Sequence, residues 1–581
     1  MRCLLAATAL TPVVFGLSAI PAAAETVIST AVTTPVLTGT ANDDLRISST
    51  GSVKPTSGAA VTINSNDSVK NEGAIAIAGA NNSTGILANT NLAGNITNTG
   101  TIVIDENYTP TDTDNDGDLD GPFAQGTNRF GIHVLSGGTF TGNIVNSGGI
   151  TVEGNNSAGI AIDSALNDSI SQTTGAISVI GDNSFGVRAG NVSGNVTLTN
   201  GSIAVTGANS VGLALDGNVG GAIVIQNAVG ATGYRSTTAP ADTSKLDADD
   251  LLQGGPAVRI GGNVAGGILF DAKPADNSTT DTDEDDDGIP DANEGTANIA
   301  VCGSALAIVI GSSSADTTIG AVASSTDGHG LVVKGSVTAA GVYQNVSSTG
   351  ISIGGLGHSV SIGGGMTVAG AVTATSSQAD ATAIHIGSGA SVPEIKVTGT
   401  VTAGGAGTAT AKSQALLIDA GATVTTIRNS GTIQAGRSTA LGTAAAIVDK
   451  SGGVNLIENT GAIGVANPSS LGDSGIAFDL GANTTGVTVK QLAVASGTAA
   501  PMISGVMQFG SGNDLLDVAD GTVTGAAKFG LGNNQLKLSG DAAMTGAVTI
   551  GSGGDTVQLA GTSVLTGNVD FGGGADSLTL A

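Results

Sequence analysis

The sequence predicts an all-β protein: a right-handed parallel β-helix (β-solenoid) of three-strand coils of about 26 residues, with shorter coils of about 20–21 residues at the C-terminus. Three observations predict it. Hydrophobic residues make up 40% of the chain but aromatic residues only 2%, so the core must be made of aliphatic side chains. A glycine-led motif recurs at a regular interval. Within each repeat, short segments of alternating apolar and polar residues are separated by turns rich in Gly and Asn.

The charge of the chain excludes one class of partner. Lys and Arg together number 19 against 47 Asp and Glu, which gives a net charge of −28. Nucleic-acid binding needs basic side chains at the phosphates, so we expect no nucleic-acid partner. The same charge disfavours adsorption to anionic lipid head groups. The aliphatic content is too high for a disordered chain.

Residues 1–24 have the pattern of a secretory signal peptide. Arg2 supplies a positive charge, residues 3–20 are apolar, and three alanines precede Glu25. The alternative is a transmembrane anchor, which Pro12 and the small-residue cleavage site disfavour. We therefore expect the mature chain to begin at Glu25.

Removal of the signal peptide would leave Cys302 as the one cysteine. A lone thiol forms no internal disulfide, and the apolar run around Cys302 predicts a packing role. No later segment has the uninterrupted apolar length of a membrane span, so we expect no further membrane helix.

The repeat defines the body of the protein, residues 25–504. Its opening glycines recur at intervals of about 26–27 residues, apart from one longer interval that contains an acidic stretch: Gly73, Gly100, Gly148, Gly175 and Gly201. Each unit carries three alternating segments, whose aliphatic residues share one face of a strand. If like positions stack in parallel, these residues fill the interior as columns. Two acidic stretches, near 107–127 and 234–295, interrupt the repeat and are expected to protrude as loops.

Residues 505–581 form a shorter repeat. Its units begin at Phe509, Phe529, Ile550 and Phe571, at intervals of about 20–21 residues. A narrower coil is expected, and because it lacks a polar cap we expect the sequence to be truncated or its end to be covered. Its G-x-G-x-D segments match half of a calcium-binding nonapeptide, but they recur at about twice the spacing that such a site requires. We interpret the Asp as a turn residue before a strand.

The strongest candidate metal site is an acidic loop in the second stretch. Its spacing fits the twelve-position calcium loop, with oxygen ligands at positions 1, 3, 5, 9 and 12 and a glycine at position 6: Asp283, Asp285, Asp287, Asp291, Glu294 and Gly288. The segment DGIPD also resembles the calcium loops of thrombospondin type 3 repeats. The alternative is a solvated acidic insert, since no helical pattern flanks the loop.

The first stretch carries a weaker version of this pattern. Its acids at positions 1, 3, 5 and 9 are Asp112, Asp114, Asp116 and Asp120. Phe123 stands at position 12, where a calcium loop needs an acid. Ca²⁺ is thus the expected cofactor for both loops, with a solvated insert as the alternative.

The sequence does not predict an enzyme. The motif GDSG at 472–475 resembles a protease nucleophile motif but falls where other repeats have turns. The four histidines are scattered, and no Cys/His cluster has the spacing of a zinc site. An enzyme acting on polysaccharides would need basic and aromatic side chains gathered on one face, and the sequence reveals no such face.

The signal peptide, the N-[TS]-G-x-I coils and the FGxGxDxLxL units together resemble the passenger region of autotransporter (type V secretion) proteins of Gram-negative bacteria. The resemblance covers nearly all of the mature chain and concerns architecture rather than activity. It implies export through the periplasm, an outer-membrane β-barrel translocator as a partner, and a cell-surface location. The family ends in a barrel of its own, and this sequence has none.

These observations predict a secreted cell-surface scaffold or adhesin whose acidic loops are ordered by calcium. Its expected partners are host or matrix glycans and proteins, with self-association as a further possibility. Two alternatives stay open at this point: a surface polysaccharide-degrading β-helix enzyme, and a self-assembling surface-layer or biofilm-matrix protein.

Overall fold

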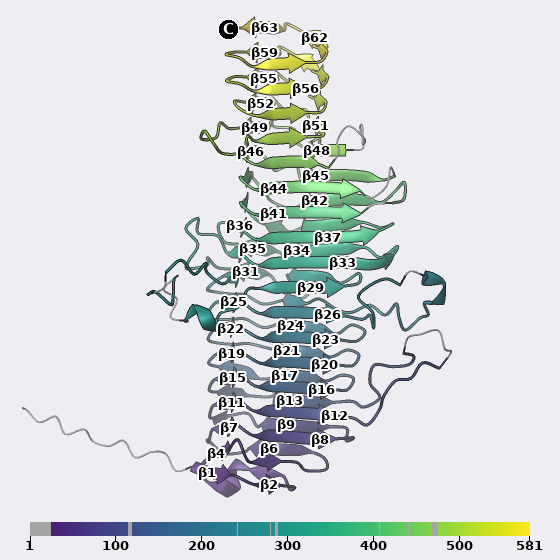
Figure 1. Cartoon of the computed structure of the whole chain (residues 1–581). Helices are drawn as coiled ribbons and strands as arrows, with labels where there is room; N and C mark the ends of the chain where they lie inside the picture. Colours follow the sequence, from purple (N-terminus) through teal and green to yellow (C-terminus); the bar gives the residue numbers. More distant parts are fainter. Residues whose placement is uncertain are drawn as a thin grey trace, which may run out of the picture.

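The computed structural model is a rod of stacked coils with three long parallel sheets (Figure 1). Sheet A has 19 strands, from β1 (Glu25–Ile28) to β63 (Ser577–Leu580). Sheets B and C have 18 strands each, from β2 (Ala31–Val32) to β60 (Val564–Thr566) and from β3 (Val36–Leu37) to β61 (Val569–Asp570). The predicted right-handed parallel β-helix is confirmed.

The structure describes residues 25–113, 119–240, 242–278, 280–284, 289–405, 407–437, 441–466 and 475–581. The expected signal peptide, residues 1–24, lies outside them. In these ranges, helix is limited to α1 (Thr38–Ala41) and two single-turn 3₁₀ segments, Thr243–Lys245 and Asp291–Asn293. Within the same ranges, no helix has the length and apolar character needed to cross a membrane.

One coil shows how the sequence produces the fold. Strand β7 (Val69–Asn71) lies in sheet A, β8 (Ala74–Ala78) in sheet B and β9 (Ser83–Ala88) in sheet C, and β11 (Ile96–Asn98) returns to sheet A. The corner between sheets B and C turns on an asparagine in the left-handed region, with φ between 52° and 57° in five successive coils: Asn82, Asn128, Asn156, Asn183 and Asn209. Asparagine tolerates this conformation better than most residues, which explains the repeated NNS, DNS and ANS turns.

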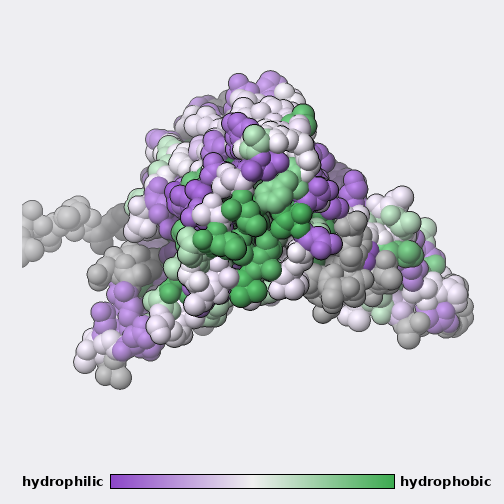
Figure 2. Space-filling model, turned by 90° about the horizontal axis from the view of Figure 1, so that it is seen from above, coloured by the Kyte–Doolittle hydropathy of each residue, from purple (hydrophilic) through white to green (hydrophobic). Residues whose placement is uncertain are grey.

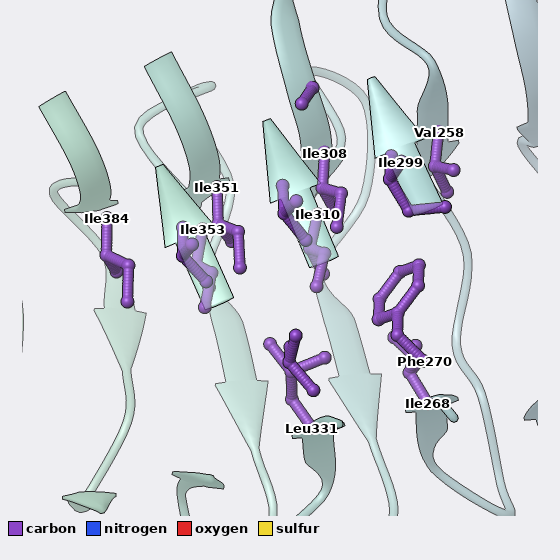
Figure 3. Packing of buried hydrophobic residues seen from close by; sticks show 14 of the residues in the cluster. Val258, Ile268, Phe270, Ile299, Ile308, Ile310, Leu331, Ile351, Ile353 and Ile384 are labelled. Atoms are coloured by element: carbon purple, nitrogen blue, oxygen red, sulfur yellow. The ribbon is translucent and has the colours of Figure 1, made fainter. Parts of the chain in front are cut away.

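The interior consists of aliphatic columns. In sheet B, isoleucines from successive coils stack in register, and each is at most 1% exposed: Ile75, Ile102, Ile150, Ile177 and Ile203. Further along the rod, Ile308, Ile351 and Ile384 of sheet C form such a column and point toward the side chains of sheet A, including Leu331 (Figure 3). Aliphatic burial in every coil explains how the chain folds with so few aromatic residues.

Buried amides extend the interior columns at the end of the sheet A strands. Asn71 donates through Nδ2 to Oδ1 of Asn98, and Asn98 donates in the same way to Asn146, both at 2.8 Å. All three residues are fully buried. Asn429 donates to Asn459 at 2.8 Å in later coils. Apart from Asn71, these asparagines belong to the N-[TS]-G motif, so the motif places a hydrogen-bonded ladder inside the rod.

A second polar ladder lies in the C-terminal coils. The buried Asp514 precedes β52 (Leu515–Val518), and its Oδ1 accepts the backbone N–H of Val487 at 2.8 Å. Asn534 accepts the N–H of Asp514 from the next coil, and Asp555 accepts the N–H of Asn534. The G-x-G-x-D aspartates thus bond to backbone groups of the preceding coil, as expected for turn residues rather than nonapeptide ligands.

Asn534 occupies the repeat position of Asp514 in the next coil, and it has an amide nitrogen where Asp514 has its second carboxylate oxygen. Its Nδ2 donates to the carbonyl oxygens of Gly530 and Gly532 at 3.4 and 3.2 Å. Asp514 has an oxygen in place of this donor, and its buried Oδ2 has no hydrogen-bond partner. Burial raises the pKa of Asp514 to about 6. Ionisation of this group therefore costs free energy that an asparagine would not lose.

We expect Asp514→Asn to stabilise the protein at pH 8 and to matter less at pH 5. The folded pKa of about 6 lies above the ordinary value of about 3.9, so the wild-type chain loses stability as pH rises from about 4 through 6. After allowance for solvent screening, the gain at pH 8 is about 1 kcal/mol. Thermal unfolding at both pH values measures it, with Asp541→Asn on the exposed surface as the control. An equal effect of the two substitutions would contradict the ladder argument.

Three long connections leave the rod. Insert 1 (residues 106–128) joins β12 (Thr101–Asp105) to β13 (Arg129–Val134). Insert 2 (residues 233–257) joins β26 (Ala228–Thr232) to β27 (Val258–Ile260). Insert 3 (residues 271–297) joins β28 (Ile268–Phe270) to β29 (Asn298–Cys302). All three project from the rod in Figure 1.

The stretch predicted as one insert near 234–295 is therefore two inserts with coil strands between them. The strands β27 and β28 are short, and they pair with Leu213 and Ile223 of the preceding coil. Such short strands between two long loops leave no visible period in the sequence. Insert 2 leaves the corner between sheets B and C, whereas insert 3 leaves the corner between sheets A and B.

The last coil exposes apolar side chains at positions that are interior in other coils. Leu578 and Leu580 are 57% and 72% exposed, whereas Leu536 and Leu538 at the same repeat positions are buried. Viewed along the rod axis from this end, apolar residues gather in the middle of the face, surrounded by polar ones (Figure 2). The centre of this end face is thus more apolar than its edge.

Candidate functional site

Inserts 1 and 2 leave the same corner of the rod, between sheets B and C. Four coil steps separate them, through β16 (Gly149–Glu153), β20 (Ala176–Ile180) and β23 (Ser202–Thr206). At the usual spacing between strands, this is roughly 19 Å along the axis. Loops of this length span the gap, and the two inserts meet in what we call the paired-insert lobe.

Arg235 of insert 2 joins the two halves of the lobe. Its guanidinium lies 4.6 Å from the ring centre of Phe123 in insert 1 and donates to the carbonyl oxygen of Gly121. It also lies 3.7 Å from a carboxylate oxygen of Asp249, which accepts the N–H of Gly121 at 2.7 Å. One cation thus contacts a backbone carbonyl, a ring and a carboxylate from segments far apart in the sequence.

A buried ion pair fixes the neck of insert 1. Arg129 donates to Glu106 at 2.9 Å, and their side chains are only 2% and 5% exposed. The Glu106 carboxylate also accepts the N–H groups of Gln125 and Gly126, at 2.7 and 2.6 Å. Both ends of the insert are therefore held by the same carboxylate, which limits its motion relative to the rod.

Insert 2 is tied to a later coil by a pair of tyrosines. The rings of Tyr234 and Tyr343 pack edge to face, with their centres 4.7 Å apart. The Tyr343 hydroxyl, on β33 (Ser336–Gln344), donates to the carbonyl oxygen of Ser236 at 3.0 Å. The base of insert 2 is therefore anchored to the rod, as that of insert 1 is.

The lobe and the rod together line an open cavity of about 440 Å³. Its floor is formed by the last residue of three successive sheet B strands, and its walls come from both inserts: Glu153, Ile180 and Thr206 below, with Pro110, Leu119, Phe123, Arg235 and Ser236 around them. This volume lies in the range of small-molecule sites. The cavity is the strongest candidate functional site because anchored contacts from both inserts shape it.

The carboxyl group of Glu153 lines the cavity, and that of Asp105 lies beside it. Glu153 ends β16, and Asp105 ends β12 in the preceding coil, so both side chains point outward at the same corner. Burial and the neighbouring Asp105 carboxyl, with Glu106 beyond it, raise the pKa of Glu153 to about 7. A carboxyl group with such a pKa near a cavity is typical of functional sites.

The structure separates the residues predicted to bind calcium. Asp114, Asp116, Asp285 and Asp287 lie outside the described residues. Asp120 lies in the lobe with two acids of insert 2 that sequence analysis missed, Asp247 and Asp249, with one oxygen of each within 4.8 Å of the others. Among the described residues, this is the one group of three potential ligands so close together, and Asp112 is not part of it.

The described acids of the other predicted loop lie against the rod rather than around one point. Glu294 is buried, and its Oε1 accepts a hydrogen bond from Gln226 Nε2 at 2.7 Å. Asp291 is buried beside Glu284, and this contact raises the pKa of Glu284. In the described part of insert 3, Asp283, Asp291 and Glu294 do not form a group of three with ligand distances.

The expectation that no face gathers basic and aromatic side chains was wrong. Sheet register aligns such residues on the outer face of sheet C: Phe130, His133, Phe185, Arg188 and Arg259. The guanidinium of Arg188 lies 5.6 and 5.4 Å from the centres of the two phenylalanine rings. The arginines also pair with Asp163 and Asp216, so these groups satisfy one another on the surface. Sequence analysis missed the face because its residues come from different coils.

The GDSG motif at 472–475 lies mostly outside the described residues, which resume at Gly475 on β48 (Gly475–Asp479).

Comparison with known proteins adds no further assignment: no family model, curated protein or solved structure matches the chain.

Proposed function

We propose that the chain is a secreted cell-surface scaffold or adhesin of the autotransporter-passenger type. The observation that carries this proposal is the combination of a long continuous rod with an anchored lobe on its side. A solenoid whose coils contact only their neighbours can form stepwise without cofactors or disulfides. The lobe carries an open cavity lined by residues of both inserts, and it is the proposed point of contact.

Secretion and surface location rest on the sequence. The pattern of residues 1–24 favours export, and one remaining cysteine with few charges suits passage through a pore. On this proposal the chain crosses the outer membrane through a β-barrel translocator and meets host or matrix glycans and proteins outside. Fractionation of cells expressing the full chain tests the location.

The adhesion proposal is tested by shortening insert 1. Residues 106–129 are replaced by residues 79–83 of the preceding coil, which preserves the corner between sheets B and C and leaves no buried Arg129 without Glu106. We expect the purified variant to keep its β-sheet circular dichroism but to lose binding to cells and matrix. Equal binding by both proteins would contradict a role for the lobe. Turnover of a glycan panel by the wild-type chain would favour the polysaccharide-degrading enzyme instead.

Calcium is the proposed cofactor, and the structure changes which substitution tests it. We expect Ca²⁺ to raise the unfolding temperature of the full chain, because three carboxylates that repel one another would share a cation. Asp120→Asn should reduce this shift if the lobe binds the ion, and Asp291→Asn should do so if insert 3 binds it. Asp216→Asn, outside both loops, is the control. No shift in wild-type protein at millimolar calcium would refute the proposal.

A further inference from the structure

The charges around the cavity in the paired-insert lobe are not balanced. Arg129 pairs with Glu106, and Arg235 with Asp249, so both nearby cations already have a carboxylate partner. Glu153 lines the cavity, and its carboxyl group lies against that of Asp105. In the part of the chain that the structure describes, neither of these two carboxyl groups forms an ion pair with a cationic side chain.

We propose that this cavity binds an organic cation: an ammonium or guanidinium group on an apolar stem. The cationic group would pair with Glu153 in the cavity, whose carboxyl group lies against that of Asp105. The stem would pack against Pro110, Leu119 and Ile180 on the way to solvent. A free amine and the side chain of a lysine or arginine from a partner protein share this chemistry.

The residues that line the cavity favour an organic cation over a metal ion. A hard metal needs about six oxygen ligands, whereas half of the residues around the cavity are Pro110, Leu119, Phe123 and Ile180, whose side chains offer none. The volume of about 440 Å³ also exceeds what a single ion fills. A stem of several methylene groups would cover this apolar surface, and the net charge of −28 would favour the approach of any cation.

The raised pKa of Glu153 predicts that the affinity for a cation depends on pH, which can be measured. Glu153 has a pKa of about 7 because burial and Asp105 disfavour its charged form; the other charged groups facing it are Glu106, Arg129 and Arg235. The ligand would stabilise the ionised pair, so binding would release a proton. The ionised fraction of Glu153 rises from about a tenth at pH 6 to about nine tenths at pH 8, and affinity should rise nearly tenfold over this range.

The test is calorimetric titration of the full mature chain with n-butylammonium and with a short lysine-containing peptide. Titration in buffers of different ionisation enthalpy counts the protons released. We expect binding at pH 8, weaker binding at pH 6, and release of up to one proton. Binding of the amine as well as the peptide would identify a free amine as sufficient, and binding of the peptide alone would identify a protein side chain as the ligand.

Three variants distinguish binding in the cavity from nonspecific electrostatic binding of a cation to an acidic protein. Glu153→Gln removes the charge but keeps the shape, and should weaken binding at least tenfold at pH 8 and abolish its pH dependence. Thr206→Phe fills the cavity and should weaken binding without touching the carboxyl pair. Asp216→Asn removes the same charge from the distant face of sheet C and should leave binding unchanged. Equal binding by all four proteins, or no binding of either probe, would overturn the proposal.

This inference does not require the scaffold proposal to hold. Loss of adhesion in the insert-1 variant together with unchanged adhesion by Glu153→Gln would leave the scaffold proposal standing and would show that the cavity is not its contact point. Amine binding by a wild-type chain that shows no adhesion would support the cavity as a cation site and would contradict the adhesin proposal.

Discussion

Gly159→Val should destabilise the rod more than any surface substitution. Gly159 lies on β17 (Ala158–Ile162), in a column of glycines in sheet C whose missing side chains would point inward. A Cβ at this position would lie 2.3 Å from Cγ2 of Ile177 and 2.7 Å from the carbonyl oxygen of Gly186. The first atom belongs to a fully buried column and the second to the neighbouring strand, so neither can move away freely. We expect a loss of about 3 kcal/mol, the upper end for overpacked cores.

Gly149→Val is the matched control for this prediction. Gly149 lies on β16 in the same coil, and a Cβ there meets nothing within 4 Å. Chemical unfolding followed by far-ultraviolet circular dichroism compares the two variants. Because coils in a solenoid can unfold in parts, amplitude as well as midpoint should be recorded. A Gly149 variant as unstable as the Gly159 variant would contradict the steric explanation.

Arg129→Met is the other substitution for which we expect a large loss of stability, and this loss should be concentrated in insert 1. The substitution keeps much of the length of the side chain but leaves the buried Glu106 carboxylate without its cation. Breaking a buried ion pair on one side costs about 3–5 kcal/mol. Hydrogen exchange should report faster exchange at Gln125 and Gly126, whose N–H groups donate to Glu106.

Arg259→Met removes an ion pair of similar geometry from the surface. Arg259 lies 2.7 Å from Asp216, but both side chains are partly exposed. Such pairs contribute about 1 kcal/mol or less. Exchange at Gln125 and Gly126 in this variant should match that of the wild type. If Arg129→Met behaves like Arg259→Met, the neck of insert 1 does not depend on the buried pair.

The coil architecture could be predicted from the sequence because stacking repeats the same environment in every coil. Ile102 meets Ile75 and Ile150 only because all three occupy the same repeat position, and that position is visible in the sequence. The interior asparagines were visible too, as part of N-[TS]-G, but a sequence alone does not show that their amides bond to one another.

The paired-insert lobe could not be predicted in the same way. The contact between Gly121 and Asp249 depends on the corner from which each insert leaves and on the number of coils between them. The calcium-loop pattern considers each loop separately, so it found Asp120 but not Asp247 or Asp249. One signal was available, because the strands that precede inserts 1 and 2 occupy equivalent repeat positions in sheet B.

The distance between the two inserts is set by a whole number of coils, and this constrains how the gene can change. Recombination between equivalent positions of two repeats would add or delete one coil at a time and leave the rod intact. Between β13 and β26 such an event would move the inserts apart or together by about 4.8 Å and break the lobe. Beyond β33, by contrast, the rod could lengthen or shorten without consequence for the lobe. Natural length variation among close homologues should therefore be concentrated in the later coils.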